Sequence, residues 1–308
     1  MSKILVTGGA GFIGSHIVDR YLDLGHEVVI IDNLVTGKRE NVNPKARFYE
    51  VDICNKKAVD NVFSKEKPHI LNHHAAQMDV RKSVADPIYD AQANIIGLLN
   101  LLESGINNGL KKIIFASSGG VVYGDAEQLP TREDYEPKHP LSPYGVAKLT
   151  SEHYLYFYYK NYRLPYVALR YANVYGPRQN PHGEAGVVAI FSQKLLDQKQ
   201  PIINGDGLQT RDYVYVGDVV NANVLAMEKG INGAFNIGTG EETNVNDIYN
   251  LLVKLTNTNF PETHGSAKPG EQKRSCLDTK LAKKILDWQP KVKLEEGLAE
   301  TVDFFKKS

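Results

Sequence analysis

A glycine-rich loop near the amino terminus constrains the fold of this 308-residue chain more than any other feature. The stretch ILVTGGAGFIGSH sets Gly8, Gly11 and Gly14 between a short apolar run and a segment with helical spacing. Glycines at these intervals permit a tight turn, the approach of the backbone to a diphosphate, and close packing of a helix on a strand. The loop therefore predicts a dinucleotide site, with Phe12 and Ile13 beside the phosphates at the positive end of the helix.

The pattern of apolar runs extends this unit through the first half of the chain. Six runs read as strands, and the segments between them read as helices; the runs are residues 3–8, 27–32, 47–53, 69–75, 111–118 and 165–171. Near-continuous apolar strands that alternate with helices are typical of a parallel sheet covered on both faces. We therefore expect an α/β fold with a doubly wound parallel sheet of the Rossmann type.

The character of the sequence changes after Tyr171, where glycine and proline become dense. Residues 215–228 and 233–240 then read as one more helix and strand that return to the sheet. We expect a cofactor-binding domain and a smaller, discontinuous substrate domain. The first comprises residues 1–176 and about 212–240, and the second comprises residues 177–211 and 241–308.

The second strand ends in Asp32, about 20 residues after the glycine loop, where dinucleotide-binding folds place the acid that holds the adenosine ribose. A carboxylate there accepts hydrogen bonds from the ribose hydroxyls and repels a 2′-phosphate, which favours NAD over NADP. Asp52 and Ile53, at the end of the third strand, are candidates to hold the adenine. Further predicted cofactor contacts lie in neighbouring loops: Asn33, Gly37, Ala75, Ala76 and Gln77.

Tyr144 and Lys148 stand four positions apart in SPYGVAKLTSEHY, so they share one face of a helix. A nearby ammonium lowers the pKa of a phenol from its usual value of about 10, which makes tyrosinate available as a general base. In isolation such a pair is more often a packed ring beside a solvated amine. Here the preceding strand ends in Ser117 and Ser118, at the sheet edge where ligands of such folds bind.

Composition and cysteine spacing exclude several classes of function. Lys and Arg number 36 and Asp and Glu number 36, so the net charge gives no sign of a nucleic-acid partner. Cys54 and Cys276 have neither CxxC spacing nor neighbouring His residues, so we expect no disulfide framework and no metal site. The first apolar run is too short for a signal peptide or a membrane span. We therefore expect a cytoplasmic protein without a membrane partner.

The glycine loop, Asp32, the serine strand and the Tyr/Lys helix, in that order, resemble the extended short-chain dehydrogenase/reductase family over essentially the whole chain. Within it, SPYGVAK, LRYANVYGPRQNPHGEAGVVAIF and RDYVYVGDV are similar to stretches of nucleotide-sugar 4-epimerases. The resemblance implies bound NAD, a UDP-sugar substrate, and a homodimer formed through the aromatic helix SEHYLYFYYKNY. It also implies interconversion of UDP-glucose and UDP-galactose through a 4-keto sugar that is reduced on its opposite face.

The same resemblance assigns roles to single residues. Tyr144 would be the base that takes the proton of the sugar 4-hydroxyl, and Lys148 would bind the nicotinamide ribose and tune that base. Asn94 and Tyr171 would support the cofactor. In the second half of the chain, the substrate diphosphate would be contacted by Asn173 and neutralised by Arg211.

The sequence departs from the family pattern at the catalytic hydroxyl. Many epimerases carry a Ser or Thr four residues before the tyrosine that matches Tyr123, and this chain has Gly119 there. We expect Ser118 to take the role, with Ser117 as the second choice. A nucleotide-sugar 4,6-dehydratase, the alternative within the family, needs an Asp and a Glu just after this hydroxyl, where Gly119 and Gly120 stand. A non-catalytic, cofactor-sensing protein is a further alternative, and the intact Tyr/Lys pair argues against it.

The stretch AKPGEQKRS resembles the uridine-binding segment of the family. Lys268 stands where an Arg is common, which gives a point charge in place of a planar fork, and Glu271 is a second candidate contact. Ser275 follows four residues later, where a bulky Tyr excludes a 2-acetamido group and a small residue admits it. We expect UDP-GlcNAc and UDP-GalNAc as additional substrates, unless Ser275 is a surface residue without substrate contact.

Overall fold

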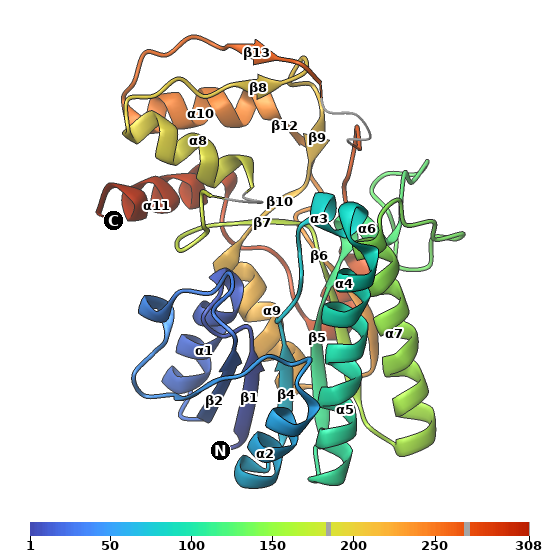
Figure 1. Ribbon diagram of the computed structural model, residues 1–308. Helices are drawn as coiled ribbons and strands as arrows, with labels where there is room; N and C mark the ends of the chain where they lie inside the picture. The colour runs from blue at the N-terminus through green and yellow to red at the C-terminus, as the bar shows by residue number, and fades with distance from the viewer. Residues whose placement is uncertain (183–185, 268–271, 308) are drawn as a thin grey trace.

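The computed structural model describes residues 1–182, 186–267 and 272–307. In that part of the chain, seven parallel strands form one sheet in the order β11-β6-β5-β4-β1-β2-β3 (Figure 1). The strands are β1 Lys3–Thr7, β2 Glu27–Asp32, β3 Arg47–Glu50, β4 Ile70–His73, β5 Lys112–Ser118, β6 Tyr166–Tyr171 and β11 Gly233–Ile237. Each lies in an apolar run singled out from the sequence, and the predicted doubly wound parallel sheet is confirmed.

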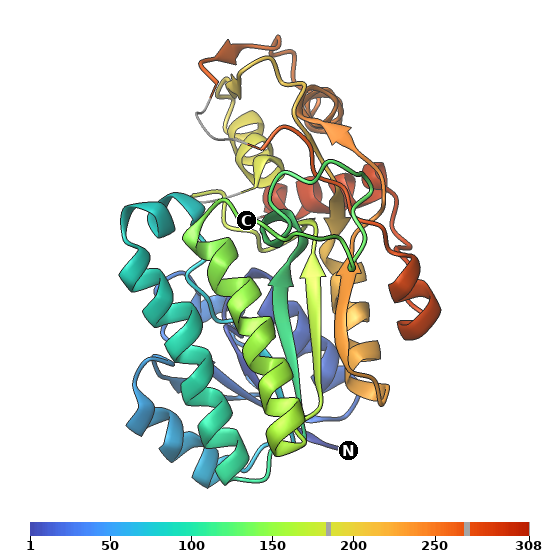
Figure 2. The same ribbon diagram turned by 90° about the vertical axis from the view of Figure 1, so that its right-hand side faces the viewer.

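Two layers of helices cover the sheet because successive strand residues face opposite sides (Figure 2). Ile4 and Val6 of β1 share one core with apolar side chains of α1 Phe12–Asp23, α9 Val216–Glu228 and the π-helical turn η3 Ala282–Leu286. Leu5, between them, packs in the opposite core with side chains of α2 Lys56–Glu66, α5 Gly97–Asn107 and α7 Pro143–Tyr162. This arrangement leaves the carboxyl ends of the strands free to form the site.

Short elements surround those carboxyl ends. They are the 3-10 turn η1 Arg39–Asn41, the helices α3 Val80–Ala85, α4 Pro87–Ala91 and α6 Gly119–Val122, and the π-helical turn η2 Gln92–Ile96. In addition, β7 Asn173–Tyr175 pairs with β10 Tyr213–Tyr215 and leads the chain away from the sheet.

A second, smaller body lies beyond the carboxyl edge of the sheet (Figure 1). Its helices are α8 Val187–Leu196, α10 Val245–Thr256 and α11 Leu294–Lys307, which share a core that includes Phe191, Tyr249 and Leu298. Two strand pairs complete it: β8 Ile203–Asn204 with β13 His264–Gly265, and β9 Thr210–Arg211 with β12 Thr243–Asn244.

The last segment of the chain departs from the domain division expected from the sequence. The sequence pattern places residues 241–308 as a whole in the substrate domain, but Ala282, Leu286 and Trp288 are buried in the core between the sheet, α1 and α9. Trp288 Nε1 also donates to the carbonyl of Asp218 at 2.9 Å. The chain therefore crosses back to the sheet before it forms α11, since burying these side chains stabilises the larger core.

Candidate functional site

The glycine loop forms a cradle of bare backbone, made by Gly8, Gly11 and Gly14. Gly8 has a φ of +69°, and a Cβ there would lie 2.7 Å from the backbone nitrogen of Ala75. A Cβ on Gly14 would lie 2.2 Å from the carbonyl oxygen of Gly8. Helix α1 begins at Phe12 with Gly11 as its N-cap, and no side chain caps it. The cradle thus presents open helix N–H groups, which suit a diphosphate.

Asp32 lies at the carboxyl end of β2, beside the cradle. It is 7% exposed and accepts hydrogen bonds from the backbone nitrogens of Ala10 and Leu34, at 3.0 and 2.9 Å. Burial raises the pKa of its carboxyl group, and these two hydrogen bonds oppose the effect. A Cβ on Gly37 would lie 2.8 Å from Asp32 Oδ1, so only glycine leaves space in front of the carboxylate.

The predicted adenine contacts gather next to Asp32. Asn33 Nδ2 donates to Asp52 Oδ2 at 3.1 Å, which joins the ends of β2 and β3. Ile53 is 7% exposed and would collide with a Cβ on Gly97, so α5 approaches it closely. The structure therefore brings these sequence-predicted residues to one edge of the sheet.

The side chain of Asn94 fixes the loop after β4 through two hydrogen bonds to its backbone. The backbone nitrogen of Gln77 donates to Asn94 Oδ1 at 3.0 Å, and Asn94 Nδ2 donates to the carbonyl of Gln77 at 2.9 Å. This pair fixes the backbone that follows Ala75 and Ala76, and Ala75 is the residue that approaches Gly8. Asn94 thus acts on the site through the position of this loop.

Helix α7 carries Tyr144 and Lys148 at its amino end. Ser142 caps it by accepting a hydrogen bond from the nitrogen of Gly145, and Pro143 occupies the first turn, where its missing N–H costs nothing. Lys148 Nζ lies 5.6 Å from the centroid of the Tyr144 ring and donates to the carbonyl of Ala116 at 2.7 Å. Burial lowers the pKa of Lys148 to about 8. A tethered cation therefore lies beside the half-buried phenol.

The two serines at the end of β5 differ in their surroundings. Ser117 is 2% exposed, and its hydroxyl donates at 2.5 Å to Glu152, which is itself paired with Arg170. Ser118 is half-buried and ends the strand. If Gly120 carried a Cβ, that atom would lie 3.9 Å from Ser118 Oγ and 3.9 Å from Asn173 Oδ1. Ser118 Oγ and Asn173 Oδ1 thus lie on the same side of Gly120, whereas the Ser117 hydroxyl is bonded to Glu152, which favours Ser118 for the catalytic hydroxyl.

The predicted substrate residues of the second half lie on adjacent chain segments. Arg211 is half-buried in β9, and its Nη1 donates to the carbonyl of Thr210 at 2.8 Å. Thr210 pairs in parallel with Arg274, which places the following residue, Ser275, alongside Arg211. Ser275 is 6% exposed, so it is not a surface residue. The predicted contacts Lys268 and Glu271 lie outside the described residues.

Tyr171 lies in a buried polar network, and the cofactor contact expected of it stays a prediction. Its hydroxyl lies 3.0 Å from His74 Nε2 and accepts from Asn223 Nδ2 at 2.8 Å. Burial raises the pKa of this phenol, and its ring belongs to the core on the α1 and α9 side of the sheet. We therefore assign Tyr171 to a buried polar network, because its hydroxyl is already occupied.

Asp212 is a structural residue that the sequence did not single out. It is 1% exposed and accepts hydrogen bonds from the nitrogens of Thr239, Gly240 and Leu277. It thereby ties the strand of Arg211 to the end of β11 and to the segment of Ser275. No local pattern reveals this role, because its partners are distant in the chain.

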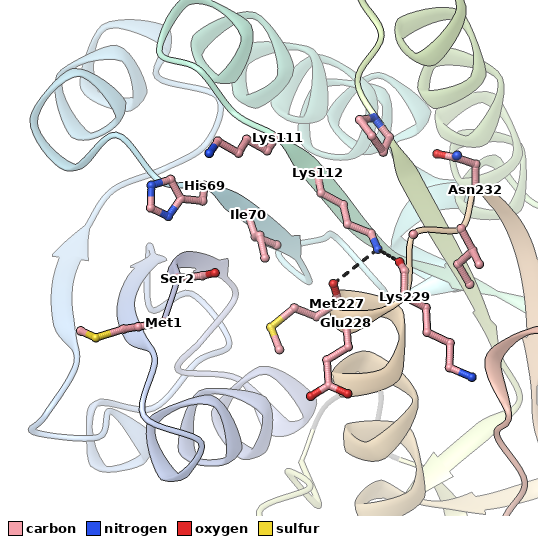
Figure 3. A pocket seen from close by; sticks show the side chains of 13 residues that line it. Met1, Ser2, His69, Ile70, Lys111, Lys112, Met227, Glu228, Lys229 and Asn232 are labelled. Atoms are coloured by element: carbon pink, nitrogen blue, oxygen red, sulfur yellow. Dashed lines mark hydrogen bonds between the residues drawn. The ribbon is translucent and has the colours of Figure 1, made fainter.

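A separate cavity of about 450 Å³ opens at the amino-terminal edge of the sheet, away from these residues (Figure 3). Lys112 Nζ donates there to the carbonyls of Met227 and Lys229 at the end of α9. These bonds satisfy carbonyls that a helix end leaves without partners. The described lining of this cavity contains none of the predicted site residues, and we assign Lys112 a helix-capping role.

Two further properties bear on the classes of function. Within residues 1–182, 186–267 and 272–307, no group of His, Cys, Asp and Glu side chains has the arrangement of a metal site. Among the helices of the same ranges, none combines the length and the apolar character that crossing a bilayer requires.

Known proteins resemble the chain over nearly its whole length. The profile of the NAD dependent epimerase/dehydratase family matches residues 4–238. The UDP-glucose 4-epimerase of Mycolicibacterium smegmatis is 44% identical over 311 residues, which cover 99% of this chain and 98% of that protein. The crystal structure of Thermotoga maritima UDP-glucose 4-epimerase with UDP-glucose is similar, with 51% identity, a TM-score of 0.97 and 99% of both chains covered. For the Thermus thermophilus UDP-glucose 4-epimerase complex with NAD, the identity is 43%, the TM-score 0.94 and the coverage 99% of both chains.

Proposed function

Because the chain belongs to the NAD dependent epimerase/dehydratase family, we propose that it is an NAD-dependent 4-epimerase that interconverts UDP-glucose and UDP-galactose. The observation that carries the proposal is the position of Tyr144 beside the buried ammonium of Lys148, at the edge of the sheet that also holds the glycine cradle. The direct test is NMR of a UDP-sugar incubated with the purified protein, together with mass spectrometry of the cofactor released on denaturation.

The residues present fit NAD. A side chain at Gly8 or Gly14 would collide with the backbone that shapes the cradle, and Asp32 offers carboxylate oxygens where an adenosine ribose would bind. When bound, NAD accepts hydrogen from the sugar and returns it. The loop of Ala75 and Gln77 would border the same cofactor.

The chain's own side chains supply the proton chemistry and the anchoring. Tyr144 takes the proton of the sugar 4-hydroxyl, and the charge of Lys148 favours its ionised form. Ser118 donates a hydrogen bond to the same sugar oxygen. Asn173 and Arg211 hold the diphosphate, so that the sugar is anchored through its nucleotide and can present either face.

A 4,6-dehydratase needs acidic residues just after the catalytic hydroxyl, and this chain has Gly119 and Gly120 at those positions. A Cβ on Gly119 would lie 2.5 Å from Leu277 Cδ1, so a larger residue there would require the Leu277 side chain to shift. Gly120 contributes no side chain to the space that Ser118 and Asn173 border. The surroundings of Ser118 therefore support epimerisation.

Asp32→Ala should weaken NAD binding and reduce discrimination against NADP. The substitution removes both the acceptor for the ribose hydroxyls and the charge that repels a 2′-phosphate. Isothermal titration of protein stripped of cofactor measures the dissociation constants of NAD and NADP for wild type and variant. An unchanged ratio of the two constants would contradict the assigned role.

Ser275→Tyr should selectively suppress the reaction of the N-acetylated sugars. We propose that UDP-GlcNAc and UDP-GalNAc are also substrates, because the small, buried Ser275 lies beside the strand of Arg211 and leaves room for an acyl group. Specificity constants for both sugar pairs, before and after the substitution, measure the effect. Equal loss of both reactions, or no activity of the wild type on the N-acetylated sugars, would refute the proposal that Ser275 determines whether a 2-acetamido group is accepted.

We also infer a homodimer, formed through the outer face of α7 and its neighbours. Val146 and Phe157 lie eleven positions apart on α7, hence on one face, and are 49% and 46% exposed. Ile88 of α4 and Ile96 of η2 add 75% and 42% exposed side chains on the adjoining elements. Apolar residues gathered in this way favour association with another protein surface.

The unpaired Cys54 and Cys276 agree with a reducing compartment, and we propose the cytoplasm.

A further inference from the structure

Asp90 is a buried acid outside the predicted site that contacts two of its members. It is 1% exposed and lies in α4, directly before the π-helical turn that carries Asn94. Its Oδ1 accepts hydrogen bonds from Asn94 Nδ2 at 3.0 Å and from Gln77 Nε2 at 2.9 Å. Since Asn94 also clasps the backbone of Gln77, Asp90 completes the network that fixes the loop after β4.

The second carboxylate oxygen of Asp90 lacks a hydrogen-bond partner. Oδ2 is buried, and no residue within 1–182, 186–267 or 272–307 donates to it. A buried charge without compensation is costly, so a folded chain retains one where a charge of opposite sign offsets it.

Lys148, on the helix that packs against α4, carries a charge of opposite sign. Helix α4 and the π-helical turn pack against α7, and the cleft between them is lined by Asp90 on one side and by Ala147 on the other. Lys148 is 4% exposed, and its hydrogen bond goes to a carbonyl, not to an acid. Burial lowers its pKa to about 8, and the charge of Asp90, followed by that of Glu152, opposes this lowering.

The second acid near Lys148 is already paired. Glu152 lies one turn further along α7, where Arg170 of β6 donates to both of its oxygens, at 3.0 and 2.6 Å. The field that Glu152 exerts on Lys148 is therefore largely cancelled by an adjacent cation, whereas the hydrogen bonds that the Asp90 side chain accepts within the described residues come from neutral amides.

Among the described residues, the other titratable neighbours of Lys148 carry no compensating charge. His73 at the end of β4 is buried and the following His74 is half-buried, and desolvation followed by the charge of Lys148 holds the pKa of each below its usual value. Both imidazoles are therefore neutral near neutral pH. From α7, the phenol of Tyr144 is the group whose ionisation Lys148 is meant to favour.

We propose that Asp90 is a positioning residue that holds Lys148 in its charged form beside Tyr144 and ties that charge to the loop bordering the glycine cradle. The acid touches neither substrate nor cofactor. Asp90 thus links the conformation of the loop after β4 to the positive charge of Lys148, which favours ionisation of Tyr144. The consequence for catalysis rests on the proposed function, but the effect on Lys148 does not.

Asp90→Asn removes the charge and keeps the shape. An asparagine still offers an oxygen to Asn94 and Gln77, so the loop network persists. An anion stabilises the protonated form of every group near it, so its removal lowers the pKa of Lys148. For the same reason, both proton losses of the coupled Tyr144 and Lys148 pair move to lower pH.

The experiment is an NMR titration of holoprotein whose lysines carry an isotope label at Cε, with the Lys148 signal assigned by its absence in Lys148→Met. In Asp90→Asn the Lys148 pKa should fall by at least about half a unit. Asp90→Ser, which removes the same charge and leaves room for water, should shift it in the same direction. The matched control is Asp86→Asn, because Asp86 is the exposed N-cap of the same helix, and it should leave the Lys148 pKa unchanged.

A pH profile of kcat/KM provides the second reading. Both limbs should move to lower pH in Asp90→Asn, whereas an acid that only supports the fold would lower kcat without moving them. An unchanged Lys148 pKa in folded Asp90→Asn and Asp90→Ser overturns the proposal. A shifted Lys148 pKa in a protein that epimerises no UDP-sugar supports it, and contradicts the proposed function instead.

Discussion

Tyr144→Phe should lower kcat by about 10³-fold while NAD remains bound, within the range that loss of a general base produces. The phenylalanine ring still fills the half-buried position in the first turns of α7. It has no oxygen to accept the proton of the sugar 4-hydroxyl. Because Lys148 is held by the carbonyl of Ala116, the cation stays in place when the phenol is removed.

Turnover of UDP-galactose and the amount of cofactor released on denaturation measure these two effects separately. A variant that keeps cofactor and loses turnover supports Tyr144 as the base. Retention of more than about a tenth of wild-type turnover would rule out that assignment. Loss of both cofactor and turnover would indicate that the ring supports the cofactor site.

Ser118→Ala should lower kcat by about 10²-fold, and Ser117→Ala should lower it much less. Ser118 Oγ and Asn173 Oδ1 lie on the same side of Gly120, whereas the Ser117 hydroxyl donates to Glu152. The two serines are therefore a matched pair: the same chemical change, one residue apart, on opposite sides of the strand. Ser117→Ala should instead lower the free energy of unfolding by about 1–3 kcal/mol, since Glu152 loses a buried partner.

Steady-state kinetics and denaturant unfolding of both variants provide the comparison. If Ser117→Ala has the larger effect on kcat and Ser118→Ala the larger effect on stability, the strand register used to assign the hydroxyl is wrong. The unfolding measurement also shows whether any loss of turnover arises from loss of fold.

The sequence predicted the large-scale architecture because the relevant signals are local. Each strand of the sheet is a short apolar run, and the positive φ of Gly8 and the close approach of Gly14 to the carbonyl of Gly8 both arise within the glycine loop. Tyr144 and Lys148 could be paired from helical spacing alone. These features depend on neighbours in sequence, which a reader of the sequence can see.

The features that escaped prediction depend on contacts between distant segments. Ser118 is preferred over Ser117 from the sequence, but the bond that engages Ser117 comes from Glu152, and the bond to the Tyr171 hydroxyl comes from Asn223 in α9. Trp288 packs against the sheet because it is buried among apolar side chains of β1, α1 and α9, which are distant from it in the sequence. Two spacings could nevertheless have indicated these contacts: Glu152 follows Lys148 by four residues, and Asp90 precedes Asn94 by four residues, so each pair lies on one face of a helix.

The central claim is that the hydrogen at C4 leaves the sugar and returns to the same carbon from the other side. Incubation of the purified holoprotein with UDP-glucose that carries deuterium at C4, without added cofactor, tests it most directly. The account predicts that NMR will show UDP-galactose with the deuterium retained at C4. Exchange of that deuterium with solvent, loss of the C6 hydroxyl, or the absence of UDP-galactose would contradict it.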